Sequence, residues 1–189
     1  AWFDVDVRTR NEVVEIDRAR QEVEVHELAT GRRYREPYDA LVLAPGAKPL
    51  APPIPGIELE GIFAVRDLVD ADRIVRWLGE RGARTAVVVG GGFIGLEMAE
   101  NLVHRGLGVS VLEAAPQLLP PFDAEMTAPV REQLEQHGVT VRLGDAVARF
   151  ERADGALEVG AASGARLRAD LAILSLGVRP ETRRAAAAG

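Results

Sequence analysis

The sequence predicts an α/β protein in which a small β segment precedes a three-layer domain with a parallel sheet and a β-meander. Residues 85–113 give an apolar strand, a glycine-rich turn, a helix and a second apolar strand, the order of a parallel α/β unit. The strand AVVVG has no polar alternation, which is typical of a strand covered on both faces. The stretch PGAKPLAPPIPG carries five prolines, which exclude a helix or a central strand and indicate a linker. We therefore place one domain at residues 1–48 and a second at 49–189.

The first domain is expected to be a small meander. Apolar and polar side chains alternate through residues 3–43, as they do in half-buried strands, and Thr30-Gly31 marks a hairpin turn. The expected strands are VDVRT, EVVEID, QEVEVHEL and YDALVLA.

The second domain alternates helices and strands before it ends in a second meander. A proline at position 129 predicts that its helix either starts late, with the proline in the first turn, or is kinked. The last residues, RRAAAAG, are weakly patterned. In chain order we expect a helix from Asp67 or Asp70 to about Leu78, which Gly82 ends, strand Thr85–Val89, helix Phe93–Arg105, strand Val109–Glu113, a helix after Asp123, which Gly138 ends, strand Val139–Leu143, and the segments VARFER, LEVG and ARLRADLAILSLG.

Composition excludes several classes of protein. The net charge is −6 without a lysine and arginine cluster, so we expect no nucleic-acid partner. No apolar run is long enough for a membrane span and the first residues do not resemble a secretory signal, so we expect a cytoplasmic protein. There is no cysteine, and the three histidines are far apart, which indicates no metal site.

The glycines of VVVGGGFIGLEMAENL have the spacing G-x-G-x-x-G where a buried strand meets a helix. In a dinucleotide-binding turn, Gly90 permits the tight bend, Gly92 lets backbone N–H groups approach a pyrophosphate, and Gly95 allows close packing of helix on strand. Gly91 and Ile94 lie within the same turn and are included in the candidate site. The helix start adds unpaired N–H groups and a partial positive charge, both of which favour a bound anion.

Glu113 ends the next strand, about twenty residues beyond the turn, where this fold carries the carboxylate that binds the adenosine ribose. A carboxylate accepts hydrogen bonds from the ribose hydroxyls and repels a 2′-phosphate. No lysine or arginine lies between Glu113 and Asp123, so we predict NAD(H) in preference to NADP(H). Two alternatives remain open: Glu113 could simply begin a solvated loop, and FAD uses the same kind of turn.

Four motifs together resemble the pyridine nucleotide-disulfide oxidoreductases, and the resemblance spans nearly the whole chain. They are YDALVLAPGAKP, VVVGGGFIGLEMAENL, VSVLEAAPQLLPPFDAEM and LAILSLGVRPET, in the family's order. The resemblance implies that residues 1–48 are the end of a first FAD-domain segment, and thus part of an incomplete FAD domain. It also implies that residues 49–189 are an inserted NAD(H)-binding domain, so we expect a piece of a longer flavoenzyme, a homodimer whose redox cysteine lies upstream.

The resemblance adds four residues to the candidate site. Phe93 matches the aromatic residue that covers the flavin, and Glu97 matches the acid that approaches the nicotinamide carboxamide. Gly177 resembles a glycine beside the nicotinamide ribose, and Gly46 a glycine at the domain crossover. Without the resemblance, we would interpret Phe93 as a core aromatic residue and Glu97 as a solvated helix charge. Both glycines are equally compatible with turns that need positive φ.

Two further features bear on the branch of the family. Pro45 replaces the threonine or serine of many relatives, which removes a hydroxyl contact to the flavin. Together with PPIPGI, Pro45 resembles the coenzyme A-disulfide reductase and NADH oxidase branch.

Two other acidic residues are not included in the candidate site. Glu181 departs from the asparagine common in relatives. Asp123 is expected to cap a helix.

The resemblance therefore implies hydride transfer from NADH to FAD, and then electron transfer to a disulfide such as coenzyme A disulfide, or to oxygen or peroxide. We expect no catalytic residue in this chain and no activity from the chain alone. The alternatives are an NADH-dependent ferredoxin or rubredoxin reductase component and a non-catalytic module that senses dinucleotides.

Overall fold

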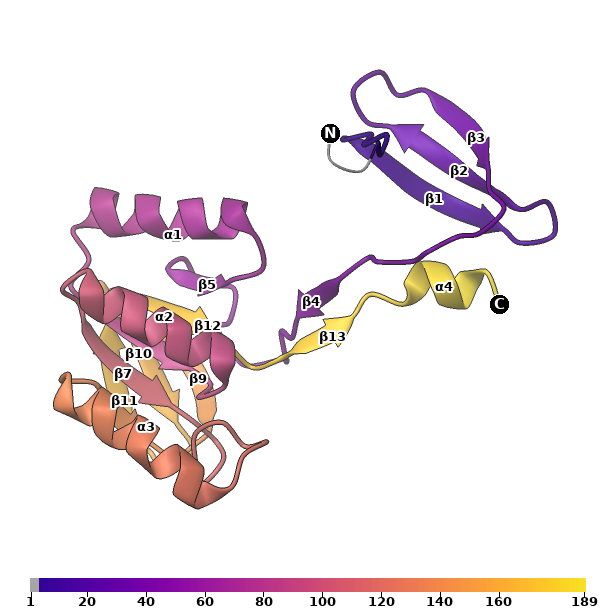
Figure 1. The fold of residues 1–189 in the computed structure, drawn as a ribbon. Helices are drawn as coiled ribbons and strands as arrows, with labels where there is room; N and C mark the ends of the chain where they lie inside the picture. Colours follow the sequence, from indigo (N-terminus) through magenta and orange to yellow (C-terminus); the bar gives the residue numbers. More distant parts are fainter. Residues whose placement is uncertain (1–3) are drawn as a thin grey trace. The chain divides into compact units, whose positions relative to one another are not determined.

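The computed structural model describes residues 4–189, and their contacts divide the chain into two units (Figure 1). The small unit contains the residues up to Ala47 together with Pro180–Gly189, and the large unit is Lys48–Arg179. The chain passes between the units at β4 (Ala47–Pro49) and β13 (Val178–Pro180), which pair in a two-stranded sheet.

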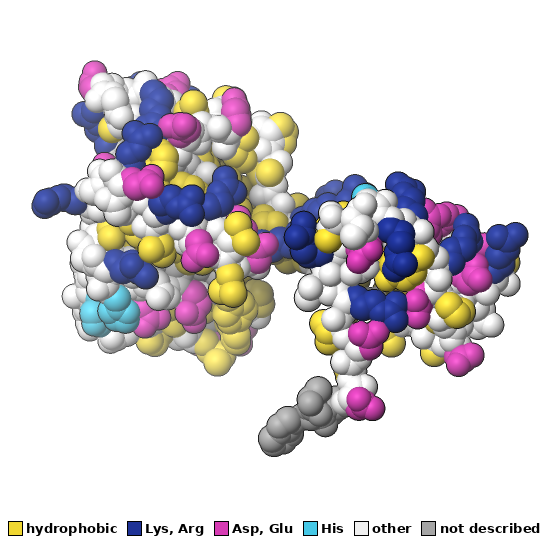
Figure 2. All heavy atoms as spheres, turned by 90° about the horizontal axis from the view of Figure 1, so that it is seen from above, with side chains coloured by type: hydrophobic (Ala, Val, Ile, Leu, Met, Phe, Trp, Pro, Cys, Tyr) yellow, Lys and Arg dark blue, Asp and Glu magenta, His cyan; other side chains and the backbone are white. Residues whose placement is uncertain are grey.

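The small unit is built on an antiparallel sheet with the order β1 (Asn11–Asp17), β2 (Glu22–Glu27) and β3 (Arg33–Pro37). Cross-strand ion pairs join Arg33 to Glu24 at 2.9 Å and Arg35 to Glu22 at 3.5 Å. Figure 2 shows the basic and acidic side chains of this unit interspersed with one another. Opposite charges on neighbouring strands thus neutralise each other at the surface.

Two of the four strands expected in this unit are wrong. VDVRT and YDALVLA are not strands, whereas β3 forms at residues 33–37, which the alternation did not single out. Val5, Val7 and Val42 are 63%, 75% and 87% exposed. Backbone N–H and C=O groups need a neighbouring strand to make a ladder, and none of the strands in residues 4–189 pairs with either segment.

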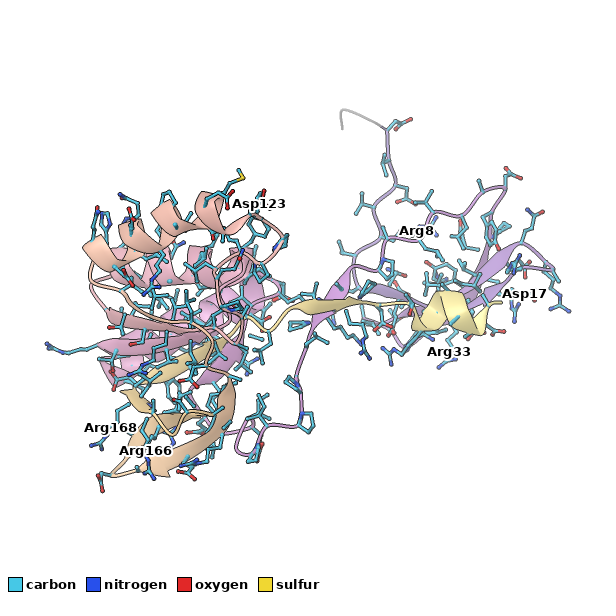
Figure 3. The ribbon with its side chains drawn as sticks, turned by 90° about the horizontal axis from the view of Figure 1, so that it is seen from below. Arg8, Asp17, Arg33, Asp123, Arg166 and Arg168 are labelled. Carbon is cyan, nitrogen blue, oxygen red and sulfur yellow. The ribbon has the colours of Figure 1, made fainter. Side chains whose placement is uncertain are left out.

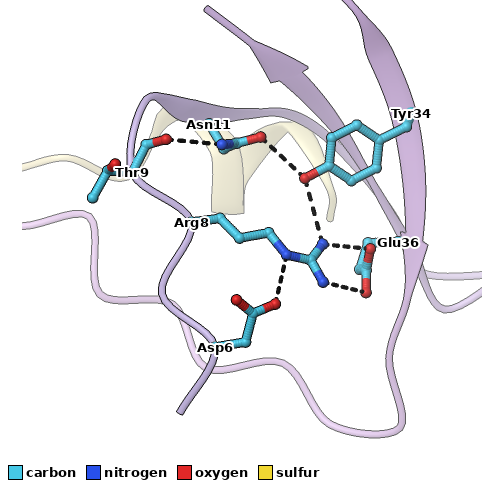
Figure 4. A network of polar contacts seen from close by, with 6 residues as sticks. All are labelled: Asp6, Arg8, Thr9, Asn11, Tyr34 and Glu36. Atoms are coloured by element: carbon cyan, nitrogen blue, oxygen red, sulfur yellow. Dashed lines mark hydrogen bonds and ion pairs between the residues drawn. The ribbon is translucent and has the colours of Figure 1, made fainter. Parts of the chain in front are cut away.

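A side-chain network instead holds the segment before β1 (Figure 4). The Arg8 guanidinium donates to Asp6 and Glu36, each at 2.7 Å, and to the Tyr34 hydroxyl at 3.4 Å. The Tyr34 hydroxyl in turn donates to Asn11 at 3.1 Å. The network links the segment to β1 and β3 without any strand pairing.

The C-terminal residues form a short helix, α4 (Arg183–Ala187), where the sequence showed only a weak pattern. Arg184 donates to the carboxylate of Glu12 at 3.1 Å and to the carbonyl oxygen of Val14. Because of these contacts with β1, Pro180–Gly189 belong to the small unit. The sequence had placed this segment in the second domain. The helix has no apolar stripe, so its position depends on contacts with residues that are distant in the sequence.

The large unit has three layers, as expected. Its parallel sheet has the order β5, β12, β6, β7 and β8, with the helices packed on one face and the antiparallel meander β9–β11 on the other. The bounds are β5 (Ile62–Ala64), α1 (Leu68–Arg81), β6 (Thr85–Val89), α2 (Phe93–His104), β7 (Gly108–Leu112), α3 (Ala124–Gln136), β8 (Thr140–Arg142), β9 (Val147–Ala153), β10 (Ala156–Ala161), β11 (Arg166–Ala169) and β12 (Leu171–Leu174).

Strand β6 is covered on both faces, which explains its uninterrupted apolar run. Ala86 and Val88 pack among the helices, whereas Val87 and Val89 pack against the meander. The chain leaves the meander through β12 and enters the parallel sheet between β5 and β6. Figure 3 shows Arg166 and Arg168 together at the outer surface of β11, and Arg166 pairs with the buried Glu158 at 3.1 Å.

Both ends of α1 follow local signals in the sequence, whereas the start of α3 does not follow its proline. The Asp67 carboxylate caps α1 by accepting from the amides of Val69 and Asp70 at 2.9 and 3.1 Å, and Gly82 ends that helix with φ 57°. Helix α3 begins at Ala124, so the late start at Pro129 is wrong and the proline lies in the second turn. The turn before it forms because the carbonyl oxygen of Asp123 accepts from the amides at positions 126 and 127.

Asp67 and Asp123 both occupy N-cap positions, and Figure 3 labels Asp123 at the start of α3. The Asp123 side chain makes no capping hydrogen bond. We therefore expect Asp67→Ala to lower the free energy of unfolding by about 1 kcal/mol, because two helix N–H groups lose their acceptor. The matched Asp123→Ala variant should lower it by no more than about 0.5 kcal/mol. Urea denaturation of both variants measures the difference, and equal losses would contradict it.

Candidate nucleotide-binding site

Three residues that follow neighbouring parallel strands lie in one row at the carboxyl edge of the sheet. Ser175 follows β12, Gly90 follows β6 and Glu113 follows β7. Their amides continue the ladder across the sheet: Ser175 donates to Val89 at 2.7 Å, Gly90 to Leu112 at 2.8 Å, and Glu113 to Arg142 at 2.9 Å. Ligands of open α/β sheets bind at this edge.

A cleft of about 780 Å³ opens at this row. Gly90, Gly92, Glu113 and Ser175 all line it, and its walls are largely apolar. Arg179 is the one basic side chain among its described lining residues. The remaining lining residues are Leu50, Ala51, Pro52, Ile54, Val89, Leu112, Ala114, Pro120, Ala146, Val147 and Leu176.

The glycines of the turn differ in whether a Cβ atom would fit at their positions. A Cβ on Gly90, where φ is 110°, would lie 2.3 Å from the carbonyl oxygen of Ser175, and a Cβ on Gly95 would lie 2.0 Å from that of Gly90. Both positions thus require glycine for packing. Gly92 has an ordinary φ of −81° and no atom within 4 Å of its Cβ position, although it is the N-cap of α2 and lines the cleft. Packing gives no reason for glycine there, whereas the close approach of a ligand does.

Gly91 and Ile94, the other two candidate residues of the turn, do not line the cleft. A Cβ on Gly91 would lie 2.6 Å from the Leu118 side chain and 3.3 Å from that of Glu113, so packing also favours glycine at this position. Ile94 is 42% exposed, and its side chain does not line the cleft.

The Glu113 carboxylate links the end of β7 to the glycine turn. One oxygen accepts from the Gly91 amide at 2.5 Å, and the other accepts from the Ala115 amide at 2.7 Å. A carboxylate oxygen has two lone pairs, so each retains an acceptor site for a hydroxyl group. The carboxylate is half-buried and faces the cleft, and these geometric features suit a vicinal diol.

A second carboxylate fixes the wall of the cleft at Ala146 and Val147. Asp145 accepts from the hydroxyl and the amide of Ser163 at 2.6 and 3.0 Å. These hydrogen bonds, from the hydroxyl first, hold the pKa of Asp145 below its usual range. The charged carboxylate therefore keeps the loop after β8 in place at neutral pH.

Phe93 and Glu97 are four residues apart and so lie on one face of α2, but neither lines the cleft. They line a separate groove of about 400 Å³ beside α3. Phe93 is 61% exposed and packs edge-to-face on Phe122, with ring centroids 5.9 Å apart. Phe93 is therefore not a core residue.

Gly46 and Gly177 both have positive φ, 73° and 97°, and neither lines the cleft. The carbonyl oxygen of Gly177 accepts from Leu50 and that of Gly46 accepts from Glu181, each at 2.9 Å. Sequence reasoning missed Ser175 and Arg179. The signal for Ser175 was its place directly after the apolar strand LAIL, which the structure locates next to β6.

The model of the family described as pyridine nucleotide-disulphide oxidoreductase matches residues 3–189. The chain belongs to this family. It is 37% identical over 186 residues to an NADH oxidase of Methanocaldococcus jannaschii, with 98% of this chain and 41% of that protein covered. It is 32% identical over 178 residues to a coenzyme A disulfide reductase of Staphylococcus epidermidis, with 94% of this chain and 39% of that protein covered.

A solved structure of the family shares the fold over the full chain. The reduced CoADR-RHD of Bacillus anthracis superimposes with a TM-score of 0.93 at 42% identity, and the match covers 100% of this chain and 34% of that one. The chain thus spans about two fifths of the length of the curated relatives described here. The α/β fold and the oxidoreductase family inferred from the sequence are both confirmed.

Alanine substitutions at Gly90 and Gly92 distinguish a glycine that packing requires from a glycine that leaves open space for a ligand. Gly90→Ala should lower the free energy of unfolding by at least about 2 kcal/mol, because it adds a clash to a strained φ. Gly92→Ala should change it by less than about 0.5 kcal/mol, because its Cβ enters open space. Thermal unfolding of the two variants tests this contrast, and a large loss for Gly92→Ala would mean that this glycine is also structural.

Proposed function

We propose that the chain is the NADH-binding part of a longer, FAD-dependent oxidoreductase. The observation that carries the proposal is the row at the sheet edge, in which the glycine turn and the Glu113 carboxylate are joined by the hydrogen bond from the Gly91 amide. The donors at the start of α2 suit a pyrophosphate, and the acceptors of Glu113 suit the adenosine ribose. The open space at Gly92 supports the same assignment.

The preference for NADH over NADPH follows from charge. Glu113 places a carboxylate at the ribose end of the cleft, and Ala114 and Pro120, which line the cleft there, carry no charge to offset a 2′-phosphate. Like charges would be brought together if the ribose were phosphorylated, whereas a free diol donates to the carboxylate.

Bound NADH would supply a hydride to the flavin of the whole enzyme. The chain's own residues bind and orient the dinucleotide: Glu113 holds the ribose, and the start of α2 holds the pyrophosphate. We further propose that Phe93 and Glu97, exposed beside the turn, contribute to the nicotinamide end in the complete protein. By analogy with the relatives, the acceptor is a disulfide such as coenzyme A disulfide, or oxygen.

The nucleotide preference is tested by calorimetric titration of the purified chain with NADH and NADPH. NADH should bind at least about tenfold more tightly, and Glu113→Ala should remove the difference, because charge-assisted hydrogen bonds contribute about 1.5–3 kcal/mol. Combining that change with Ala114→Arg should reverse the preference, because arginine receives the 2′-phosphate. Glu132→Ala, an exposed carboxylate of α3 outside the cleft, is the control and should change nothing. Absence of binding at millimolar NADH, in the chain and in the complete protein, would overturn the proposal.

The chain alone should not reduce a disulfide when NADH and FAD are added. It has no cysteine to receive electrons from a flavin. NADH oxidation followed at 340 nm, with coenzyme A disulfide as acceptor, should stay at the rate of free FAD. A rate above that background would show that the chain contains more of the catalytic site than we propose.

A further inference from the structure

The hydroxyl group of Ser175 is buried and has no hydrogen-bond partner among the described residues. The residue itself is half-buried and lines the cleft. Buried hydroxyl groups nearly always have a partner, because leaving one unsatisfied is costly. An unpartnered hydroxyl on a residue that lines a cleft indicates a partner that arrives with the ligand.

Ser175 is packed directly against the glycine turn. Its Cβ lies 3.3 Å from the Cβ positions of both Gly90 and Gly95. Alternation along β12 points Ser175 to the face of the sheet opposite Leu174, which packs on the meander. Ser175 therefore lies on the helix face of the sheet, below the first turn of α2.

Strand order decides which half of a dinucleotide Ser175 would meet. Glu113 and Ser175 follow the two strands that flank β6, one on each side. A dinucleotide whose adenosine ribose lies at Glu113 and whose pyrophosphate lies at the turn after β6 continues toward β12. The other end of the ligand is thus on the side of Ser175.

We propose that Ser175 is a dinucleotide-binding residue, whose hydroxyl group hydrogen-bonds the ribose on the nicotinamide side of the pyrophosphate. This inference rests on the proposed NADH-binding function and adds a residue to it. Rotation about χ1 exchanges the staggered positions of the hydroxyl without moving the backbone, which its hydrogen bond to Val89 holds. The hydroxyl can donate or accept, and both suit a ribose hydroxyl group.

Three ligands of different length test the proposal: ADP, ADP-ribose and NADH. ADP contains the adenosine ribose and both phosphates, whereas ADP-ribose and NADH also contain the second ribose. Ser175→Ala should weaken NADH and ADP-ribose by about fivefold to tenfold, as for one neutral hydrogen bond, and leave ADP unchanged. Glu113→Ala should weaken all three. Calorimetry, with displacement of NADH fluorescence for the weaker ligands, measures the affinities.

The melting temperature distinguishes a ligand-binding role of Ser175 from a structural role. Because the hydroxyl has no partner among residues 4–189, Ser175→Ala should keep or raise the melting temperature of the unliganded protein. Ser110→Ala, on β7 and outside the cleft, is the matched control and should leave all three affinities unchanged. A lowered melting temperature with unchanged affinities would assign Ser175 a structural role and overturn the proposal.

The remaining outcomes are also decisive. Equal weakening of ADP and ADP-ribose would show a contact on the adenosine side or a disturbed turn, and would overturn the assignment to the nicotinamide half. Unchanged binding of NADH by Ser175→Ala would overturn this inference alone. If neither the wild-type chain nor the complete protein binds any of the three ligands, the proposed function fails, and the inference fails with it.

Discussion

The close approach of α2 to the carboxyl ends of β6 and β12 is the constraint on which the large unit depends. Backbone packs on backbone here, because Gly90 touches Ser175 and Gly95 touches Gly90 where no side chain fits. This contact fixes the start of α2 at the sheet edge and leaves its first N–H groups beside the cleft. The rest of the three-layer packing is arranged around it, with helices on one face and the meander on the other.

Glu113 extends this constraint to the next strand. Its hydrogen bonds with Gly91 and Ala115 join the turn after β6 to the loop after β7, and the amide of Asp145 donates to its carbonyl oxygen at 3.0 Å. One residue therefore connects three of the loops at the sheet edge. The carboxylate that we propose to bind a ribose is held in place before any ligand binds, which would limit the entropy lost on binding.

The small unit shows what happens when strand-like sequence finds no neighbour. Its three paired strands are stabilised by ladders and ion pairs, whereas residues 38–44 form no strand and are largely exposed despite an apolar pattern. β-propensity describes how a side chain fits a sheet and does not provide the sheet. In a longer flavoenzyme of the kind proposed, such a segment would have further strands to pair with.

The sequence by itself determined the elements whose signals are local. The strand, turn and helix of residues 85–105, the Asp67 cap and the Gly82 stop depend on sterics and hydrogen bonds between close neighbours in the chain. Only the tertiary structure decided that β12 lies beside β6, that Ser175 and Arg179 line the cleft, and that Phe93 and Glu97 line another groove. These features join residues that are far apart in the sequence. Pairing between strands leaves no local pattern, because any strand with a suitable apolar face could occupy the same position.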